Sequence, residues 1–163
     1  MLGGREFGSG ARRTGDGFMR CGDGHVRWGI FGAAGAVFVV REDDGPRVML
    51  QKRSAMAHEG GTWSCCGGAL DEGEAPYDGA LREASEEVGA IPEIVAVLGE
   101  YVFRPSNDWA YTTVVVEVGT RFGSSINFET DAVDWFAPDE IDALSLHAGF
   151  ASAWPHLRAL VES

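Results

Sequence analysis

Four charged residues close together in the chain, Arg82, Glu83, Glu86 and Glu87, carry the clearest chemical information in this sequence. At about 100° per residue they fall within one arc of a helix. The opposite side of that helix is apolar, with Tyr77, Ala80, Leu81, Ala84 and Val88. Glu83 repels Glu86 and Glu87 by roughly 0.2 to 0.5 kcal/mol each, and no lysine is interleaved. Because Mg²⁺ takes oxygen ligands and often bridges to substrate phosphates, a magnesium-pyrophosphate site explains the cluster.

A solvated acidic helix face is the alternative explanation, and the flanking positions argue against it. From Gly68 the chain follows G-x5-E-x7-R-E-A-x-E-E-x-G-A, with Glu74 and Gly89 at the outer fixed positions. This pattern resembles the Nudix box, which marks hydrolases acting on nucleoside diphosphates linked to another moiety. Every charged and glycine position is matched. The two aliphatic positions are filled by the smaller Ala84 and Ala90.

Local chemistry around the box predicts a loop followed by a helix over residues 76–88. Pro76 suits the first helical turn, where its missing N–H has no partner to lose. Asp78 places negative charge near the positive end of the helix dipole. Gly89 suits a left-handed C-terminal cap. Backbone freedom for a loop that closes over phosphate or metal comes from Gly67, Gly68 and Gly73.

The resemblance implies catalytic roles for the box residues. Glu86 and Glu87 would ligate Mg²⁺, for which Mn²⁺ could substitute, and the Gly67 carbonyl would add an oxygen. Glu83 would be a further ligand or the base that activates water. The predicted reaction is in-line attack of water on one phosphorus, which cleaves a phosphoanhydride.

Two further acidic residues receive roles from the same resemblance. Glu74 would pair with the catalytic-helix residue Arg82 and fix the loop against the helix. Glu129 lies six residues before Trp135, where many MutT-like proteins carry a glutamate that binds metal or acts as a base. An acid in an ordinary loop is the alternative for Glu129.

Substrate contacts are predicted from residues outside the helix. Arg53 and Lys52 resemble the basic residues at a strand end that contact phosphate, and an ordinary exposed strand end is the alternative. Gly68 belongs to the loop expected to close over the phosphates. His58 and Trp109 are candidates to bind or stack on a nucleobase, although a single aromatic residue is more often part of a core.

Composition bounds the function. The 163 residues, 45% of them apolar, suit one globular domain with a sizeable core. The net charge is -12, and residues 68–90 alone hold seven acids against one arginine. Such a chain lacks the basic footprint of a protein that binds nucleic-acid polymers, so we expect a small nucleotide as the partner. The apolar run 29–40 is too short to span a bilayer.

The cysteines indicate the compartment. An odd number of them, Cys21, Cys65 and Cys66, favours free thiols in a reducing cytoplasm. Cys66 stands where MutT-like proteins usually have proline before the two glycines. A zinc site built from Cys21, His25 and the adjacent Cys65 and Cys66 is a weaker alternative. Redox sensitivity, through oxidation of an exposed thiolate, is a further one.

The chain divides into a flexible leader over residues 1–20, which is rich in glycine and arginine, and a single Nudix domain over 21–163. Apolar patterns predict strands at 29–40, 47–53, 95–103, 111–118 and 131–136. A short helix is expected from Pro138, and a closing helix over 148–161 that Pro155 delays or kinks. The fold class is therefore α/β (α+β): a mixed β-sheet between helices, and the resemblance implies a Nudix-type α/β/α sandwich.

The substrate is predicted from likeness within the family. Segments such as HVRWGIFGAAG at 25–35 and HEGGTW at 58–63 resemble actinobacterial MutT-type enzymes that sanitise 8-oxo-guanine nucleotides. The predicted substrate is 8-oxo-dGTP or 8-oxo-GTP. ADP-ribose hydrolysis stays open because Pro105 lies fifteen residues past Ala90. A regulator that binds nucleotides without cleaving them, and an isopentenyl diphosphate isomerase, are disfavoured by the intact carboxylates. Dimers are frequent in the family, so the resemblance also suggests a homodimer.

Overall fold

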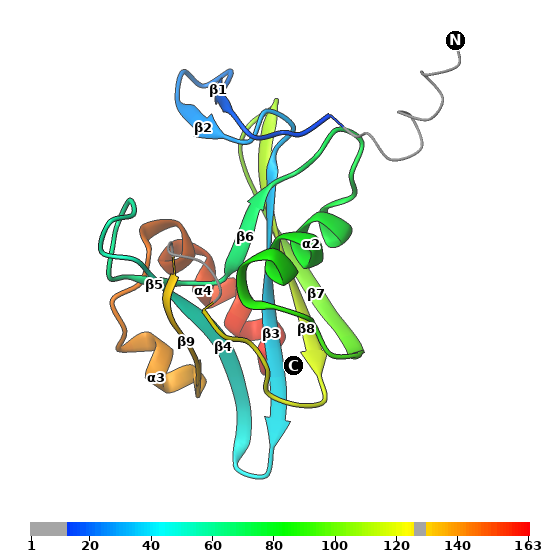
Figure 1. The fold of residues 1–163 in the computed structure, drawn as a ribbon, viewed down its shortest axis with the longest axis vertical. Coiled ribbons are helices and arrows are strands. Elements are labelled where there is room, and N and C mark those ends of the chain that lie inside the picture. Colours follow the sequence, from blue (N-terminus) through cyan, green and yellow to red (C-terminus); the bar gives the residue numbers. More distant parts are fainter. Residues whose placement is uncertain (1–12, 126–129) are drawn as a thin grey trace.

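The computed structural model describes residues 13–125 and 130–163, and within these ranges seven strands form one mixed sheet (Figure 1). Its main path runs β5 (Trp63–Ser64), β4 (Gly45–Arg53), β3 (Ala33–Glu42), β8 (Trp109–Val118) and β7 (Ile94–Ser106). Off this path, β6 (Cys66–Ala69) pairs with β3, and β9 (Thr130–Phe136) pairs with β4. Strands β3 and β8 are parallel, and the other pairs are antiparallel.

Strand β3 changes its neighbour along its length, which opens a fork in the sheet. Residues 39–42 of β3 pair with β4, whereas residues 33–36 pair with β6. Beyond the fork, β4 continues and pairs with β5 at Gln51 and Lys52. The two arms stay close enough for Cys66 Sγ to lie 3.8 Å from Gln51 Oε1. The fork therefore leaves room for polar side chains between β4 and β6.

Helices cover both faces of the sheet (Figure 1). Helix α2 (Pro76–Val88) packs on one face and α4 (Ala148–Val161) on the other, with α3 (Pro138–Asp142) near β4 and β9. Side chains alternate along β3, so that Ala36 and Phe38 join the core under α2 while Val37 joins the core under α4. This is the predicted α/β/α arrangement. Among the described residues, no helix combines the length and the apolar character needed to cross a membrane.

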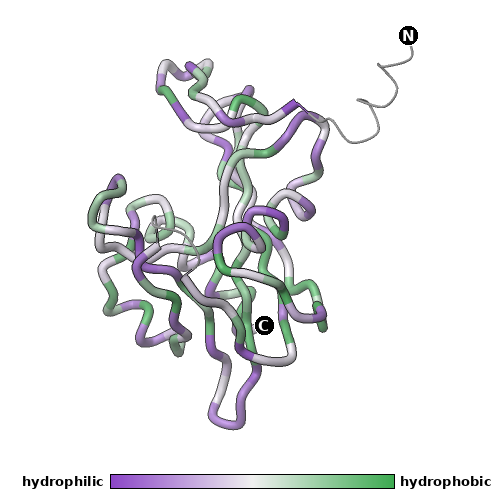
Figure 2. The backbone as a smooth tube through the Cα atoms, viewed as in Figure 1, coloured by the Kyte–Doolittle hydropathy of each residue, from purple (hydrophilic) through white to green (hydrophobic). Residues whose placement is uncertain are grey.

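The hydropathy of the residues follows this layered arrangement of sheet and helices (Figure 2). The turn between β3 and β4 is hydrophilic, and the strands that lie between the helices are predominantly apolar. The hydrophobic effect contributes roughly 25 cal/mol for each Å² of apolar surface that is removed from water. Phe38, Met49 and Leu50 are almost completely buried, so these strands hold the sandwich together.

The predicted elements agree with the observed ones in kind and differ at their ends. The box helix occupies residues 76–88, as predicted. The strand expected from residue 29 begins only at Ala33, because Gly29 and Gly32 take φ values of 106° and 89° and turn the chain first. Pro155 does not delay the closing helix, which is continuous from Ala148 to Val161. The short strands β5 and β6 were not predicted, because CGGA lacks the β-branched residues typical of strands.

Part of the predicted leader is packed against the domain. Phe18–Arg20 forms strand β1, which pairs with β2 (Val26–Trp28), so the expected boundary at residue 21 falls inside a hairpin. Earlier in the chain, the Arg13 carbonyl accepts a hydrogen bond from the Glu72 N–H at 2.8 Å. Residues 1–12 lie outside the described part of the chain.

Candidate active site

Glu74 and Arg82 join the loop before α2 to the middle of the helix. The Glu74 side chain is 6% exposed, and its two carboxylate oxygens accept hydrogen bonds from Arg82 Nε at 2.8 Å and Nη2 at 2.9 Å. The Asp71 N–H also donates to Glu74 Oε1 at 2.9 Å. The predicted ion pair is therefore present, in the bidentate geometry that guanidinium and carboxylate groups favour. Arg82 Nη2 also donates to the Ala69 carbonyl at 3.0 Å, which ties the helix to β6.

Glu83 lies directly against the backbone of Gly68. A Cβ atom at residue 68 would overlap the Glu83 carboxylate, so β6 can approach the helix here because residue 68 is glycine. The Glu83 side chain is 15% exposed and accepts a hydrogen bond from Arg82 Nη1 at 3.0 Å. Burial nevertheless raises the pKa of Glu83 above its ordinary value. Gly68 thus makes the space in which this carboxylate is held.

Glu87 enters the fork from the last turn of α2. Its Oε1 accepts hydrogen bonds from Gln51 Nε2 at 2.9 Å and from the Gly67 N–H at 3.3 Å. Burial raises the pKa of Glu87 to about 8, against the lowering effect of Gln51, and the nearby Glu83 raises it further. With a pKa of about 8, Glu87 is largely protonated at neutral pH unless a cation takes the place of the proton.

Glu86 differs from the other two carboxylates in its exposure. Its side chain is 57% exposed, and its Oε2 lies 3.4 Å from Arg82 Nη1. As the described side chains are placed, no three histidine, cysteine or acidic residues converge on a point that could hold a metal ion. For the three carboxylates to hold one cation, their side chains must move from these positions. The donor set nevertheless fits a hard divalent cation, since it consists of carboxylates whose mutual repulsion a cation would relieve.

The residues predicted to contact phosphate fall on different faces. Alternation along β4 places Lys52 with Leu50 on the α4 face, opposite to Gln51 and the α2 carboxylates. The structure therefore does not bring Lys52 to the acidic cluster. Arg53, at the end of β4, donates from Nε to the His58 carbonyl at 2.7 Å. Its guanidinium group thus braces the loop that follows the strand.

His58 and Trp109, the predicted nucleobase contacts, also lie in different settings. The His58 side chain is 82% exposed, with its Nε2 3.4 Å from Glu59 Oε2. Trp109 is buried beside Cys21, and its Nε1 donates to the Gly29 carbonyl at 3.1 Å. Trp109 therefore packs under the hairpin of β1 and β2 and does not present a free face for stacking, contrary to the prediction. Glu129 lies outside the described residues, and its role stays a prediction.

Gly89 ends α2 in a conformation other than the predicted one. Its φ is positive, at 98°, but its ψ of -174° is extended, so it does not adopt the left-handed helical cap. This region of the map is essentially restricted to glycine. The requirement for glycine at the end of the box helix therefore holds, for a different backbone reason.

The adjacent cysteines point to opposite sides of the sheet. Cys65 joins the core under α4, and Cys66 joins the core under α2. Burial raises the pKa of Cys65 to about 12 and that of Cys66 well above its usual range, which keeps both thiols protonated and unreactive. Cys21 is also buried, and all three cysteines are free, as predicted. Among the described residues none of them belongs to a metal-binding group, so the zinc alternative is not supported.

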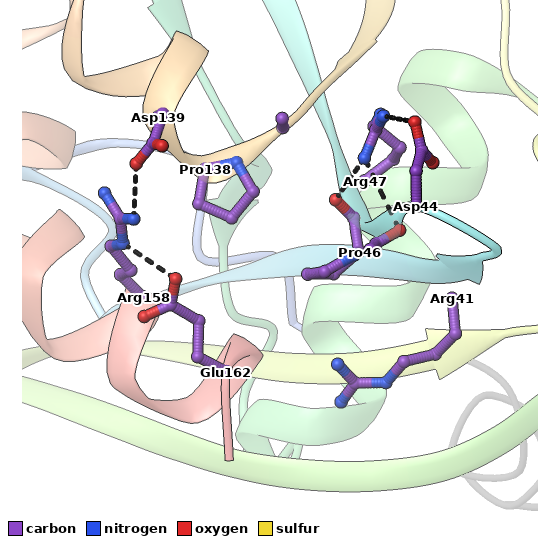
Figure 3. Close-up of a pocket in the computed structure, with 10 residues that line it drawn as sticks. Arg41, Asp44, Pro46, Arg47, Pro138, Asp139, Arg158 and Glu162 are labelled. Carbon is purple, nitrogen blue, oxygen red and sulfur yellow. Dashed lines mark hydrogen bonds and ion pairs between the residues drawn. The ribbon is translucent and has the colours of Figure 1, made fainter.

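A second charged region lies around a cavity of about 410 Å³ between the β3–β4 turn and helices α3 and α4 (Figure 3). Arginines line it, and each is paired with a carboxylate. Arg47 Nη2 lies 2.7 Å from Asp44 Oδ2, and Arg158 Nη2 lies 2.6 Å from Asp139 Oδ1. Arg41 pairs with Glu117 at 3.4 Å. Because each of these arginines already has a carboxylate partner within the chain, the cavity does not offer an uncompensated cation to an anionic ligand.

Sequence reasoning missed Gln51 as a site residue. It lies two positions after the buried Met49 and shares its face of β4, so it is a polar residue at an inward-facing position. That placement was the available indication, because a buried amide needs hydrogen-bond partners. Its partner, Glu87, could not be identified from sequence spacing alone.

Comparisons with known proteins agree with this geometry. A model of the NUDIX domain matches residues 32–158. A Mycobacterium tuberculosis protein provisionally named 8-oxo-dGTP diphosphatase 3 is 40% identical over 137 residues, which cover 80% of this chain and 63% of that protein. A Bifidobacterium longum protein, named as a fusion of a nucleoside triphosphate pyrophosphatase and a Nudix hydrolase, is 34% identical over 83% of this chain and 29% of its own length.

Among solved structures, a Nudix hydrolase from M. smegmatis, RenU, superposes with a TM-score of 0.75. It is 33% identical, and the match covers 90% of this chain and 94% of that one. The chain spans just under two thirds of the length of the M. tuberculosis relative, whereas it matches nearly the whole of the solved structure. By its fold, its box residues and these matches, the chain belongs to the NUDIX domain family.

Proposed function

We propose that this protein is a Mg²⁺-dependent Nudix hydrolase that cleaves the phosphoanhydride of a nucleoside triphosphate, with 8-oxo-dGTP or 8-oxo-GTP as the substrate. The observation that carries the proposal is the set of α2 carboxylates held against the glycine strand β6, two of them with raised pKa values. The name of the M. tuberculosis relative supports the choice of substrate.

Different residues of the chain have different roles in the proposed reaction. Glu86 and Glu87, with the Gly67 carbonyl, would hold the cation, and Glu83 would be a further ligand or accept the proton of the attacking water. When bound, Mg²⁺ would neutralise and orient the linked phosphates of the substrate. Arg82 keeps Glu83 in place and, through Glu74, fixes the loop before the helix.

The proposal includes a setting for this activity. Residues 21–163 would act as one Nudix domain on a small nucleotide, in the cytoplasm, without binding a nucleic-acid polymer or a membrane. A homodimer is part of the proposal because such assemblies are frequent in the family. The free, buried cysteines are consistent with a reducing compartment.

A substrate panel tests the proposal. The purified protein is incubated with 8-oxo-dGTP, 8-oxo-GTP, dGTP, ADP-ribose or NADH, with Mg²⁺, with Mn²⁺ or with a chelator, and products are separated by chromatography. We expect the two oxidised nucleotides to be hydrolysed fastest, only with a divalent cation, and at a faster rate than dGTP. Release of pyrophosphate or of orthophosphate would identify the phosphorus attacked.

Two results would count against this assignment. Preferential release of AMP from ADP-ribose would replace the substrate while keeping the hydrolase. Tight nucleotide binding without turnover of any compound would replace the hydrolase with a binding protein.

A further inference from the structure

Gln51 occupies the fork between β4 and β6 at the point where Glu87 enters it. The side chain belongs to the face of β4 that α2 covers, and the residue is 7% exposed. Beyond this point β4 no longer pairs with β3, so an amide can reach across to the helix. Gln51 therefore connects the sheet to the last turn of the box helix.

The hydrogen bonds of Gln51 determine which way its side-chain amide is oriented. The Thr130 hydroxyl donates to Gln51 Oε1 at 3.4 Å, and the Cys66 thiol lies 3.8 Å from the same oxygen. Gln51 Nε2 then donates to Glu87 Oε1 at 2.9 Å. The acceptor end of the amide thus faces two donors, and its donor end faces a carboxylate, so the orientation of the amide is determined by its neighbours.

These contacts distinguish the two oxygens of Glu87. Oε1 already accepts from Gln51 Nε2 and from the Gly67 N–H, which leaves Oε2 as the oxygen with free acceptor capacity. The bond from the amide also restricts the rotation of the carboxylate plane. Groups that hydrogen-bond metal ligands in this way orient them, and their removal typically lowers metal affinity by about 10 to 100-fold.

We propose that Gln51 is a positioning residue that fixes the Glu87 carboxylate so that one of its oxygens is presented to the divalent cation. This inference rests on the proposed function, because it takes Glu87 as a cation ligand. It adds a residue outside the box, on a different strand, whose side chain does not itself need to touch the cation or the substrate. Thr130 supports it from β9 by holding the amide oxygen.

The test uses Gln51→Met, which keeps the length of the side chain and removes its hydrogen bonds. Binding of Mn²⁺ is measured without substrate from the decrease in the free-ion spin-resonance signal, and Mg²⁺ is titrated during hydrolysis of 8-oxo-dGTP. We expect Mn²⁺ affinity to fall and the half-saturating Mg²⁺ concentration to rise, each by about 10 to 100-fold. Saturating Mg²⁺ should restore most of the turnover, which a general loss of structure would not allow.

Thr113→Val is the matched control, because Thr113 is a buried polar residue of the same sheet and shares the face of Val115, under α4. It should leave both measurements unchanged. If Gln51→Met fails to fold in a thermal unfolding check, Thr130→Val replaces it and should give a smaller shift in the same direction. Wild-type affinity in whichever of the two variants folds would overturn the positioning role.

The outcome for the unmodified protein separates the two proposals. If it binds Mn²⁺ and hydrolyses nucleotide while Gln51→Met does so equally well, the positioning role is wrong and the hydrolase remains. If the unmodified protein neither binds Mn²⁺ nor hydrolyses any nucleotide, the proposed function fails and the role of Gln51 fails with it.

Discussion

The two charged regions of this molecule use the same kinds of side chains but bury their carboxylates to different depths. Around the cavity at the β3–β4 turn, Arg41, Arg47 and Arg158 each meet at least one carboxylate. On and before α2, the single Arg82 meets Glu74, Glu83 and Glu86. Acids outnumber arginines in both regions, since Arg158 alone contacts three carboxylates. Those three are 89%, 51% and 47% exposed, whereas Glu74 and Glu83 are 6% and 15% exposed, so water solvates the excess negative charge in one region and not in the other.

The pKa values show the consequence of this difference. Hydrogen bonds to Asp139 and Glu162 raise the pKa of Arg158, so these carboxylates favour the charged form of the arginine. At the box helix, burial raises the pKa of Glu83 and of Glu87, which means that their charged forms are disfavoured. Carboxylates that water already solvates need no ligand. Carboxylates that are buried together gain from a cation, and this separates the candidate site from the cavity.

The largest expected effect comes from neutralising a carboxylate of the box helix. Glu86→Gln keeps size and shape and removes a proposed cation ligand, so turnover should fall by at least about 10² to 10⁴-fold. Asp139→Asn, which neutralises an acid that is 89% exposed beside the cavity, should keep full turnover. The rates are measured by the release of product from 8-oxo-dGTP, with circular dichroism to confirm folding. Equal activity in the two variants would remove the distinction between the regions.

Breaking the Glu74–Arg82 pair should give the largest loss of stability. Arg82→Met leaves Glu74 almost completely buried without its guanidinium partner. Removing one partner of a buried pair typically costs 3–5 kcal/mol, and we expect about 2 kcal/mol here because the Arg82 side chain is 29% exposed and screened by solvent. Urea unfolding measures it. The double variant with Glu74→Met should recover part of the loss, and strict additivity of the two changes would argue against a coupled pair.

The pH dependence of stability should sharpen the comparison. An unfolded glutamate has a pKa near about 4.3, whereas that of Glu87 in the fold is about 8. Between these values the folded state holds a proton that the unfolded state has released, so the free energy of unfolding should fall as pH rises towards 8. We expect the wild type to lose about 2 kcal/mol more than Glu87→Gln between pH 6.5 and 8.5. This window avoids most of the titration of His147, whose pKa burial lowers.

The stabilising effect of Mg²⁺ should grow as pH rises, whereas the free energy of unfolding without Mg²⁺ should fall. Because the cation would compete with the proton on Glu87, its stabilising effect on thermal unfolding should be larger at pH 8.5 than at pH 6.5. Glu87→Gln provides the reference without that proton. An equal shift in melting temperature at both pH values would show that Mg²⁺ does not bind at this carboxylate.

Sequence predicted those features that depend on local spacing. The extent of α2, the Glu74–Arg82 pair and the buried strands follow from helical and strand periods and from the box pattern. The missed features depend on distant pairing. Strand β6 exists because it pairs with β3, and Gln51 meets Glu87 across 36 positions of the chain. Trp109 was assigned to the nucleobase by residue type, but the hairpin of β1 and β2 buries it.

The smallest effect is expected at the cavity between the β3–β4 turn and helices α3 and α4, where the carboxylates are exposed. Arg158 contacts Asp139, Asp142 and Glu162, yet the three carboxylates are 89%, 51% and 47% exposed. Exposed ion pairs typically contribute about 0 to 1 kcal/mol, because water and salt already solvate the charges. Arg158→Met should therefore change the free energy of unfolding far less than Arg82→Met does and leave 8-oxo-dGTP turnover unchanged. The same urea unfolding and product-release assays measure both. A loss of turnover in this variant, with folding intact, would mean that the cavity communicates with the box helix and that exposure of the carboxylates does not identify a region without function.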